Sequence, residues 1–210
     1  MIDLYTWSTP NGRKVSIFLE EAGLDYEVHP INITKDEQFA PEFLEFSPNN
    51  KIPAIVDHES GVRMMEAGAI LLYLAKKTGT FQPSNAEEHW QTMQWLMMQT
   101  GSVGPMLGQA HHFLKFNRGA STYAEQRYGK ETRRIYGVLD RRLRSTAHLA
   151  GANYGLADIA TWPWIARFEW QDIDLNEFPG VLRWYREIAS REAVQRGYDV
   201  PKTNATVPVP

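Results

Sequence analysis

The sequence contains no cysteine. This absence excludes structural disulfides, thiolate metal sites and a Cys-X-X-Cys redox pair within the chain. If the protein carries out thiol chemistry, the reacting sulfur must therefore come from a bound ligand.

Neither sign of charge is in large excess. The 210 residues carry a formal net charge of −3, and the 22 lysines and arginines are spread along the chain. Neither a nucleic-acid footprint nor a polybasic membrane patch is indicated, so small-molecule or protein partners are favoured. The hydrophobic content of 43% is ample for one large core or two small ones.

Long apolar runs are also missing. The N-terminal residues show no basic segment leading into an apolar stretch, so we expect no secretory signal and a cytoplasmic protein. Residues 91–114 carry no charged side chain, but their glutamines, glycines and proline make a membrane span a poor interpretation. Burial between domains or subunits is the better one.

The first 80 residues alternate between strand and helix patterns. Apolar residues at helical spacing lead to Gly23, a typical C-terminal cap, and His29-Pro30 favours an edge strand. The expected strands are residues 2–6, 26–33, 54–57 and 62–65, and the expected helices are residues 15–22 and 68–77. We therefore predict a compact α/β domain over residues 1–80.

No strand pattern follows the proline-containing linker at residues 81–85. Asn85 suits a helix N-cap, and the three prolines of residues 199–210 indicate an extended tail. Helical periodicity covers residues 87–114, 123–146, 156–169 and 178–190. We predict an all-helical domain over residues 87–198.

The Ile52-Pro53 step runs directly into the strand-like Ala54-Ile55-Val56. This pattern is typical of a cis-proline turn at a sheet edge. Such a turn would aim the backbone N–H and C=O of Ile52 outward, where an extended peptide could add as a further strand.

The segment Thr9-Pro10-Asn11-Gly12 lies at the turn between the expected first strand and first helix. A hydroxyl at the N-cap and a proline in the first turn make a helix N-terminus that favours an anion. An ordinary helix cap is the simpler interpretation. The position of the segment relative to Ile52-Pro53 favours the anion site.

Together with Glu66 and the helical residues 68–74, these segments resemble the thioredoxin-like half of a glutathione transferase. The resemblance extends over nearly the whole chain. Residues 47–58 and 104–113 are similar to the bacterial Nu class, whose members are glutathione-dependent disulfide-bond oxidoreductases. The resemblance implies a thioredoxin-like α/β N-terminal domain followed by an all-α C-terminal domain, a homodimer, and glutathione as the bound co-substrate.

The resemblance also implies which hydroxyl meets the glutathione sulfur. In the Nu class a threonine and an asparagine approach the sulfur, and they correspond to Thr9 and Asn11. Tyr5 and Ser8 are competing candidates, because a phenol or a serine holds the sulfur in other classes. Tyr5 lies within the strand and is expected to be packed.

Glutathione carries one ammonium group and two carboxylates, so its pocket needs an acid and several donors. By resemblance, Glu66 takes the ammonium group while the main chain of Ile52-Pro53 pairs with the ligand. Ala67 stands where family members have serine or threonine, so one hydrogen bond to a charged group, worth about 1.5–3 kcal/mol, would be missing. The Ala67 N–H can still donate.

Three further residues are assigned by the resemblance. Gln38 matches a Nu-class glutamine that contacts the ligand, and Lys51 could neutralise a carboxylate, although either could be solvated. Gln126-Arg127-Tyr128 reproduces a pattern that points an arginine into the domain cleft. There Arg127 could donate two hydrogen bonds to the carboxylate of a second glutathione. The alternative is that Arg127 faces solvent.

The pair His111-His112 does not predict a metal site, because adjacent helical histidines point in different directions and no acidic cluster accompanies them. We expect no metal. Asp158, three residues after Gly155, matches a folding signal of the family and is expected to be structural.

The leading hypothesis is the reduction of small disulfides by thiol exchange with two bound glutathione molecules. The alternatives are conjugation of glutathione to an electrophile or reduction of a peroxide, and a non-catalytic binding module with the same fold. The expected partner is a small disulfide or electrophile, and neither a nucleic acid nor a membrane.

Overall fold

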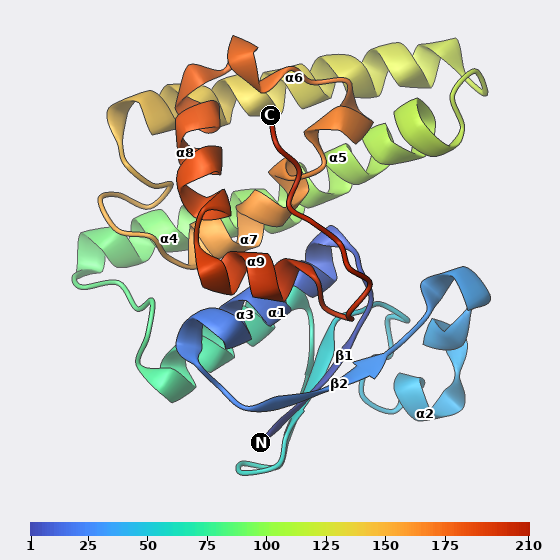
Figure 1. Ribbon diagram of the computed structural model, residues 1–210, viewed down its shortest axis with the longest axis vertical. Helices are drawn as coiled ribbons and strands as arrows, with labels where there is room; N and C mark the ends of the chain where they lie inside the picture. The colour runs from blue at the N-terminus through green and yellow to red at the C-terminus, as the bar shows by residue number, and fades with distance from the viewer. The chain divides into compact units, whose positions relative to one another are not determined.

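The computed structural model describes all 210 residues, which divide into two units. The first unit contains Met1–Gln82 and Ser190–Val207, and the second contains Pro83–Ala189 and Pro208–Pro210. Most elements of both are labelled in Figure 1.

The first unit is built on a four-stranded sheet with the order β2-β1-β3-β4. β1 (Ile2–Thr6) is parallel to β2 (Tyr26–Pro30) and antiparallel to β3 (Ala54–Asp57), which pairs with β4 (Val62–Met65). β2 is an edge strand, as His29-Pro30 indicated. The thioredoxin-like arrangement predicted from the sequence is confirmed.

Alternate residues of β1 point to opposite faces of the sheet. Ile2, Leu4 and Thr6 are buried in the core. Tyr5, on the other face, packs its ring against Phe43 and Phe46, with centroids 6.4 and 4.5 Å away. Tyr5 is therefore packed, as expected.

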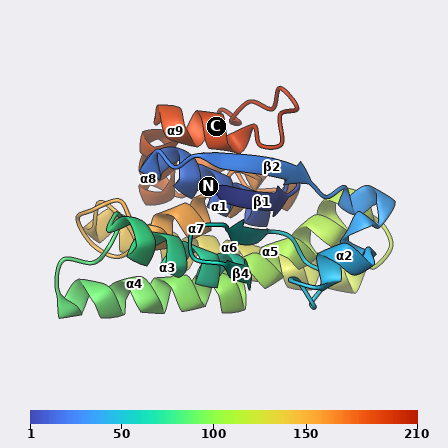
Figure 2. The same ribbon diagram turned by 90° about the horizontal axis from the view of Figure 1, so that it is seen from below.

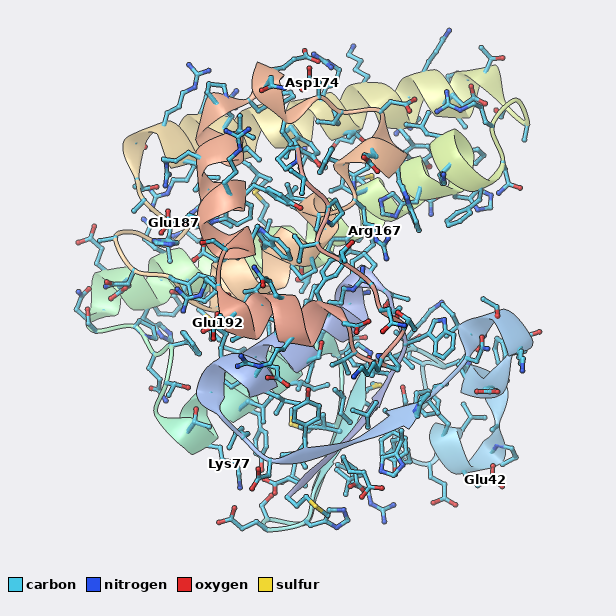
Figure 3. The ribbon with its side chains drawn as sticks, viewed as in Figure 1. Glu42, Lys77, Arg167, Asp174, Glu187 and Glu192 are labelled. Carbon is cyan, nitrogen blue, oxygen red and sulfur yellow. The ribbon has the colours of Figure 1, made fainter.

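Two helices follow the strands of this unit. α1 (Pro10–Ala22) ends at Gly23, whose φ of 62° is the left-handed conformation that a C-terminal cap requires. α3 (Ala67–Thr78) is tied to the β3–β4 hairpin, because Lys77, labelled in Figure 3, lies 2.9 Å from Asp57 and 2.6 Å from Glu59. The segment between β2 and β3 contains short helices that the sequence patterns did not reveal: Ile33–Lys35, Glu37–Phe39 and α2 (Pro41–Leu44).

α9 (Glu192–Tyr198) packs along α1, beside which it is drawn in Figures 1 and 2. Arg13 donates through Nε to the carbonyl of Tyr198 at 2.9 Å and lies 3.5 Å over its ring. Ser16 donates to the carbonyl of Gly197 at 2.7 Å. α9 is thus grouped with the first unit, whereas the sequence pattern placed these residues in the predicted helical domain over residues 87–198. Helical periodicity reports a buried face but not the surface that buries it.

The second unit is all-helical, as predicted. Residues 86–116 form one helical run, in which α4 (Ala86–Met98) and α5 (Gly104–Ala110) are each followed by a π-helical segment. The remaining α-helices are α6 (Thr122–Ser145), α7 (Leu156–Ile165) and α8 (Pro179–Ala189), and two short 3-10 helices, Phe168–Gln171 and Leu175–Glu177, lie between α7 and α8. None of the helices has both the length and the apolar character needed to cross a bilayer.

Asp158 joins three segments of the second unit. One carboxylate oxygen accepts from the Leu149 N–H at 2.9 Å and from Trp184 Nε1 at 2.8 Å, and the other accepts from the Gly155 N–H at 3.1 Å. Burial of this group raises its pKa, although the hydrogen bonds act in the opposite direction. The contacts are those of a structural residue, as the sequence indicated.

The α1–α9 packing predicts the effect of a single methyl group. A Cβ added at Gly197 would lie 2.6 Å from Ile17 Cα, so Gly197→Ala should lower the free energy of unfolding by about 1–3 kcal/mol. Gly129→Ala in α6 is the matched control, because its Cβ meets open space and alanine favours the helix by about 0.8–1 kcal/mol. Urea denaturation measures both. Equal stability of the two variants would contradict close packing of α9 on α1.

Candidate active site

The candidate site begins at the N-terminus of α1. Thr9 is the N-cap, and its Oγ1 accepts from the Gly12 N–H at 3.2 Å. Because this bond uses an oxygen lone pair, and the hydroxyl proton has no acceptor within the chain, Thr9 can still donate to a bound anion. Asn11 is half-buried in the same first turn.

Gly12 allows the chain to fold tightly here. A Cβ at this position would lie 2.3 Å from the Trp7 carbonyl oxygen and 2.4 Å from Thr6 Oγ1. Any side chain would push the turn away from β1. The helix N-terminus, with its partial positive charge, is therefore held directly beyond the end of β1.

The register of the sheet brings two further segments to the end of the sheet where β1 runs into α1. Tyr5 of β1 pairs with Ala54 of β3, which pairs with Met65 of β4. Consequently Thr9 follows the end of β1, Ile52 precedes the start of β3 and Glu66 follows the end of β4, all at the same end of the sheet. This grouping is what the sequence motifs predicted, although they are far apart in the chain.

The Ile52–Pro53 peptide bond is cis, as the sequence pattern indicated. Neither the N–H nor the C=O of Ile52 is hydrogen bonded within the chain. An extended peptide could satisfy both groups by adding as a strand. The adjacent Lys51 is exposed, and its carbonyl accepts from Ser47 Oγ at 2.7 Å.

Glu66 occupies the N-cap position of α3 with an unusual backbone, at φ 68° and ψ 106°. A positive φ is costly for a residue with a side chain, by about 1–3 kcal/mol, and such strain is concentrated at functional sites. Its exposed carboxylate accepts only a long hydrogen bond, 3.5 Å from Asn49 Nδ2. Ala67 follows as the first, buried residue of α3.

Sequence reasoning missed Lys14, which is only 3% exposed on the inner face of α1. Burial lowers the pKa of Lys14 to about 7, and the negative charge of Glu66 acts against this shift. The signal available in the sequence was a lysine inside an otherwise apolar helix face. Lys14 is thus a buried amine that titrates close to Glu66.

Gln38 lies in the loop that leaves β2. Its Nε2 donates to Asp36 Oδ1 at 3.4 Å, while its Oε1 is buried without a hydrogen-bond partner. The register joins Thr6 to Pro30, so this loop starts at the sheet edge where Thr9 and Ile52 lie.

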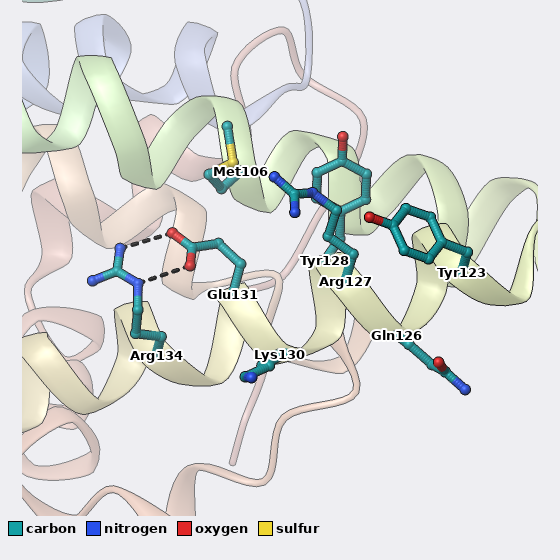
Figure 4. Close-up of a pocket in the computed structure, with 8 residues that line it drawn as sticks. All are labelled: Met106, Tyr123, Gln126, Arg127, Tyr128, Lys130, Glu131 and Arg134. Atoms are coloured by element: carbon teal, nitrogen blue, oxygen red, sulfur yellow. Dashed lines mark hydrogen bonds and ion pairs between the residues drawn. The ribbon is translucent and has the colours of Figure 1, made fainter.

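Arg127 lies in the second unit, in a cavity of about 640 Å³ between α5 and α6 that Figure 4 shows. Glu131 holds Arg134 through two bonds of 2.7 Å. Arg127 and Lys130 have no ion pair within the chain, so the cavity favours an anion. Met106 lines the cavity from α5, and the other lining residues come from α6: Tyr123, Gln126, Arg127, Tyr128, Lys130, Glu131 and Arg134.

The adjacent His111 and His112 point in different directions, as expected for neighbouring residues of a helix. His111 is buried, lies 2.9 Å from Gln171 Nε2 and stacks on Trp164. Burial and the nearby Arg167 lower its pKa to about 4. His112 is exposed beside Asn117, so the two rings do not face a common ligand.

The chain matches two family models. Residues 1–76 match the glutathione S-transferase N-terminal domain, and residues 94–192 match the glutathione S-transferase C-terminal domain. Among curated proteins, the disulfide-bond oxidoreductase YfcG of Escherichia coli is 50% identical over 198 residues, which cover 92% of each chain. The disulfide-bond oxidoreductase YghU of the same organism is 37% identical and covers 97% of this chain and 76% of its own length.

Solved structures of glutathione transferases are also similar to this chain. A glutathione transferase from Burkholderia graminis, with two glutathione molecules bound per subunit, has a TM-score of 0.90 and 41% identity, covering 97% of this chain and 89% of its own. A glutathione transferase from Pseudomonas putida, with one glutathione disulfide bound per subunit, has a TM-score of 0.90 and 41% identity, covering 95% and 91%.

The lowered pKa of Lys14 predicts how stability depends on pH. The pKa of an unperturbed lysine, as in the unfolded chain, is 10.5, and that of Lys14 in the folded protein is about 7. Between these values the unfolded chain binds more protons, so the Lys14 contribution makes the free energy of unfolding rise with pH. Lys14→Met should remove this rise between pH 7 and 9, whereas Lys76→Met, at an exposed position, should keep it. Urea denaturation at both pH values gives the slopes, and an unchanged slope in Lys14→Met would contradict the assignment.

Proposed function

Because this chain belongs to the glutathione S-transferase family, we propose that it is an enzyme that reduces small disulfides with two molecules of glutathione. The observation that carries the proposal is the 50% identity, over 92% of the chain, to a disulfide-bond oxidoreductase. The absence of cysteine supports it, because both reducing sulfurs must then come from the ligand.

In this reaction one glutathione thiolate attacks a sulfur of the substrate disulfide. A mixed disulfide forms, and the other substrate sulfur leaves as a thiolate that takes up a proton. The second glutathione thiolate then attacks the glutathione sulfur of the mixed disulfide, which releases the second substrate thiol and oxidised glutathione. Two electrons pass from the two glutathione sulfurs to the substrate, so the protein supplies no sulfur.

Thr9 and Asn11 are proposed to stabilise the attacking thiolate. A hydrogen bond to a charged group contributes about 1.5–3 kcal/mol, and a helix N-terminus about 0.3–1 kcal/mol. Since one pKa unit corresponds to about 1.4 kcal/mol, these contributions can lower a thiol pKa from about 8.5 to about 6–7. The free hydroxyl proton of Thr9 supports this role.

The tripeptide is proposed to bind along the edge beside Thr9. Ile52 would pair with its main chain, and Glu66 would take its ammonium group. The N–H of Ala67 would donate to the neighbouring carboxylate without the help of a hydroxyl. The unpaired main chain of Ile52 and the weakly held carboxylate of Glu66 support these roles. Gln38 and Lys51 are proposed to contact the ligand from the same sheet edge.

Arg127 is proposed to bind a carboxylate of the second glutathione. Its guanidinium has no ion-pair partner within the chain, whereas the neighbouring Arg134 is already held by Glu131. A planar guanidinium suits a carboxylate because it can donate two parallel hydrogen bonds.

Conjugation of glutathione to an electrophile is the second candidate. Met106, Tyr123 and Tyr128 give the cavity of Arg127 an apolar and aromatic lining that an electrophile could occupy. This reaction needs one glutathione per turnover. It therefore predicts tighter binding of reduced than of oxidised glutathione.

We also propose a homodimer. Trp90 and Met97 lie one heptad apart on α4 and are 63% and 51% exposed. Large exposed apolar side chains on one helix face favour an interface with a partner. The cytoplasmic location stays a prediction.

Thr9→Val tests the sulfur site. The variant should lower turnover of 2-hydroxyethyl disulfide by at least about 10-fold and move the pH–rate profile to higher pH, because one donor to the thiolate is lost. Thr9→Ser is the control, since it keeps the hydroxyl and the helix cap. Wild-type turnover with a wild-type pH profile in Thr9→Val would remove Thr9 from the mechanism.

Isothermal titration calorimetry with both forms of glutathione tests Arg127 and separates the two candidates. The wild type should bind oxidised glutathione at least as tightly as reduced glutathione. Arg127→Ala should weaken binding of the oxidised form by about 10-fold or more, the size expected for a charge-assisted bond. Arg118→Ala, which removes an exposed arginine paired with Asp172, is the matched control. Tighter binding of the reduced form would favour conjugation, and no binding would leave a non-catalytic module.

A further inference from the structure

A group of histidine and carboxylate side chains lies on the sheet of the first unit. Asp3 is near the start of β1, Glu27 and His29 are on β2, and His58 begins the turn after β3. One ligand atom from each of Asp3, Glu27 and His29 lies within 4.8 Å of the others. His58 Nε2 lies 2.8 Å from Asp3 Oδ2.

We propose that Asp3, His29 and His58, together with Glu27, form a binding site for a transition-metal dication such as Zn²⁺. Two imidazoles and two carboxylates are a donor set that suits Zn²⁺. Mg²⁺ and Ca²⁺ instead prefer sites made entirely of oxygen.

The His29–Asp3 separation supports a shared ion, whereas His58 Nε2 and Asp3 Oδ2, 2.8 Å apart, form a hydrogen bond that a bound ion would replace. His29 Nε2 lies 3.5 Å from Asp3 Oδ1 and makes no hydrogen bond, although this nitrogen is shielded from solvent. Two ligands of a tetrahedral Zn²⁺, each about 2.0–2.2 Å from the metal, lie about 3.4 Å apart. The His29–Asp3 spacing thus fits two ligands of one ion better than a hydrogen bond.

The charges also favour a cation. Glu27 pairs directly with Asp3 in the register of β1 and β2, so two carboxylates face each other across neighbouring strands. Like charges in such positions destabilise a sheet unless a cation compensates them. The two histidines provide nitrogen ligands at that point, and His58 is half-exposed, which leaves the ion a path from solvent.

The scaffold orients the ligands. Tyr5 stacks on His29 with ring centroids 4.7 Å apart and an interplanar angle of 17°, and β1 is paired on both sides. The backbone N–H of His58 donates to the Met1 carbonyl at 3.2 Å. A bound ion would join the edge strand β2, the central strand β1 and the β3–β4 turn, and so stabilise the first unit.

Calorimetric titration of the full-length, untagged protein with ZnCl₂ tests the site. The wild type should bind one Zn²⁺ per chain and gain thermal stability. The double variant His29→Gln/His58→Gln should lose at least about 10-fold in affinity, because both nitrogen ligands are removed. Asp3→Asn should also weaken binding. Since the chain has no cysteine, thiolates cannot contribute to the signal.

The double variant His89→Gln/His112→Gln is the matched control, because it removes two exposed histidines outside the cluster. It should bind Zn²⁺ like the wild type. Equal affinity in the two double variants, no saturable Zn²⁺ binding to the wild type, or a preference for Ca²⁺ or Mg²⁺ would each overturn the proposal and leave only a hydrogen-bonded histidine–aspartate cluster. Disulfide reduction should persist in both double variants, so this test and that of the proposed function can fail separately.

Discussion

The register of the central sheet is the constraint on which the candidate site depends. Because Tyr5 pairs with Ala54 and Ala54 with Met65, one end of each of these three strands lies at the same end of the sheet. A shift of one residue would turn every side chain of a strand to the other face. The main chain of Ile52 and the carboxylate of Glu66 would then be displaced relative to the helix N-terminus at Thr9 by the rise of one strand residue, about 3.3 Å.

The electrostatics at this end of the sheet combines the exposed carboxylate of Glu66 with the buried amine of Lys14. Glu66 faces solvent on a strained backbone, while Lys14 lies inside, where burial favours its neutral form. The proposed site, which would hold an ammonium group and a thiolate, needs opposite charges in separate places. The helix N-terminus provides positive potential through backbone dipoles, which cannot be lost by deprotonation.

The second unit shows how pairing decides which arginine is available. Arg134 and Arg127 line the same cavity, but Glu131 neutralises Arg134 and leaves Arg127 without an ion pair. In α7 of the same unit the buried Asp158 accepts from three donors, so this carboxylate is used for folding. The charge used for folding is thus buried, whereas the charge proposed to bind a ligand lines a cavity.

The sequence by itself determined the strand and helix order, the cap at Thr9, the turn at Ile52-Pro53 and the absence of protein thiols, because these depend on residue type and local spacing. Only the tertiary structure decided that α9 packs on α1, that Lys14 is buried near Glu66, and that Asp3, His29 and His58 meet. Those contacts join residues from distant segments, and local periodicity carries no information about which surfaces come together.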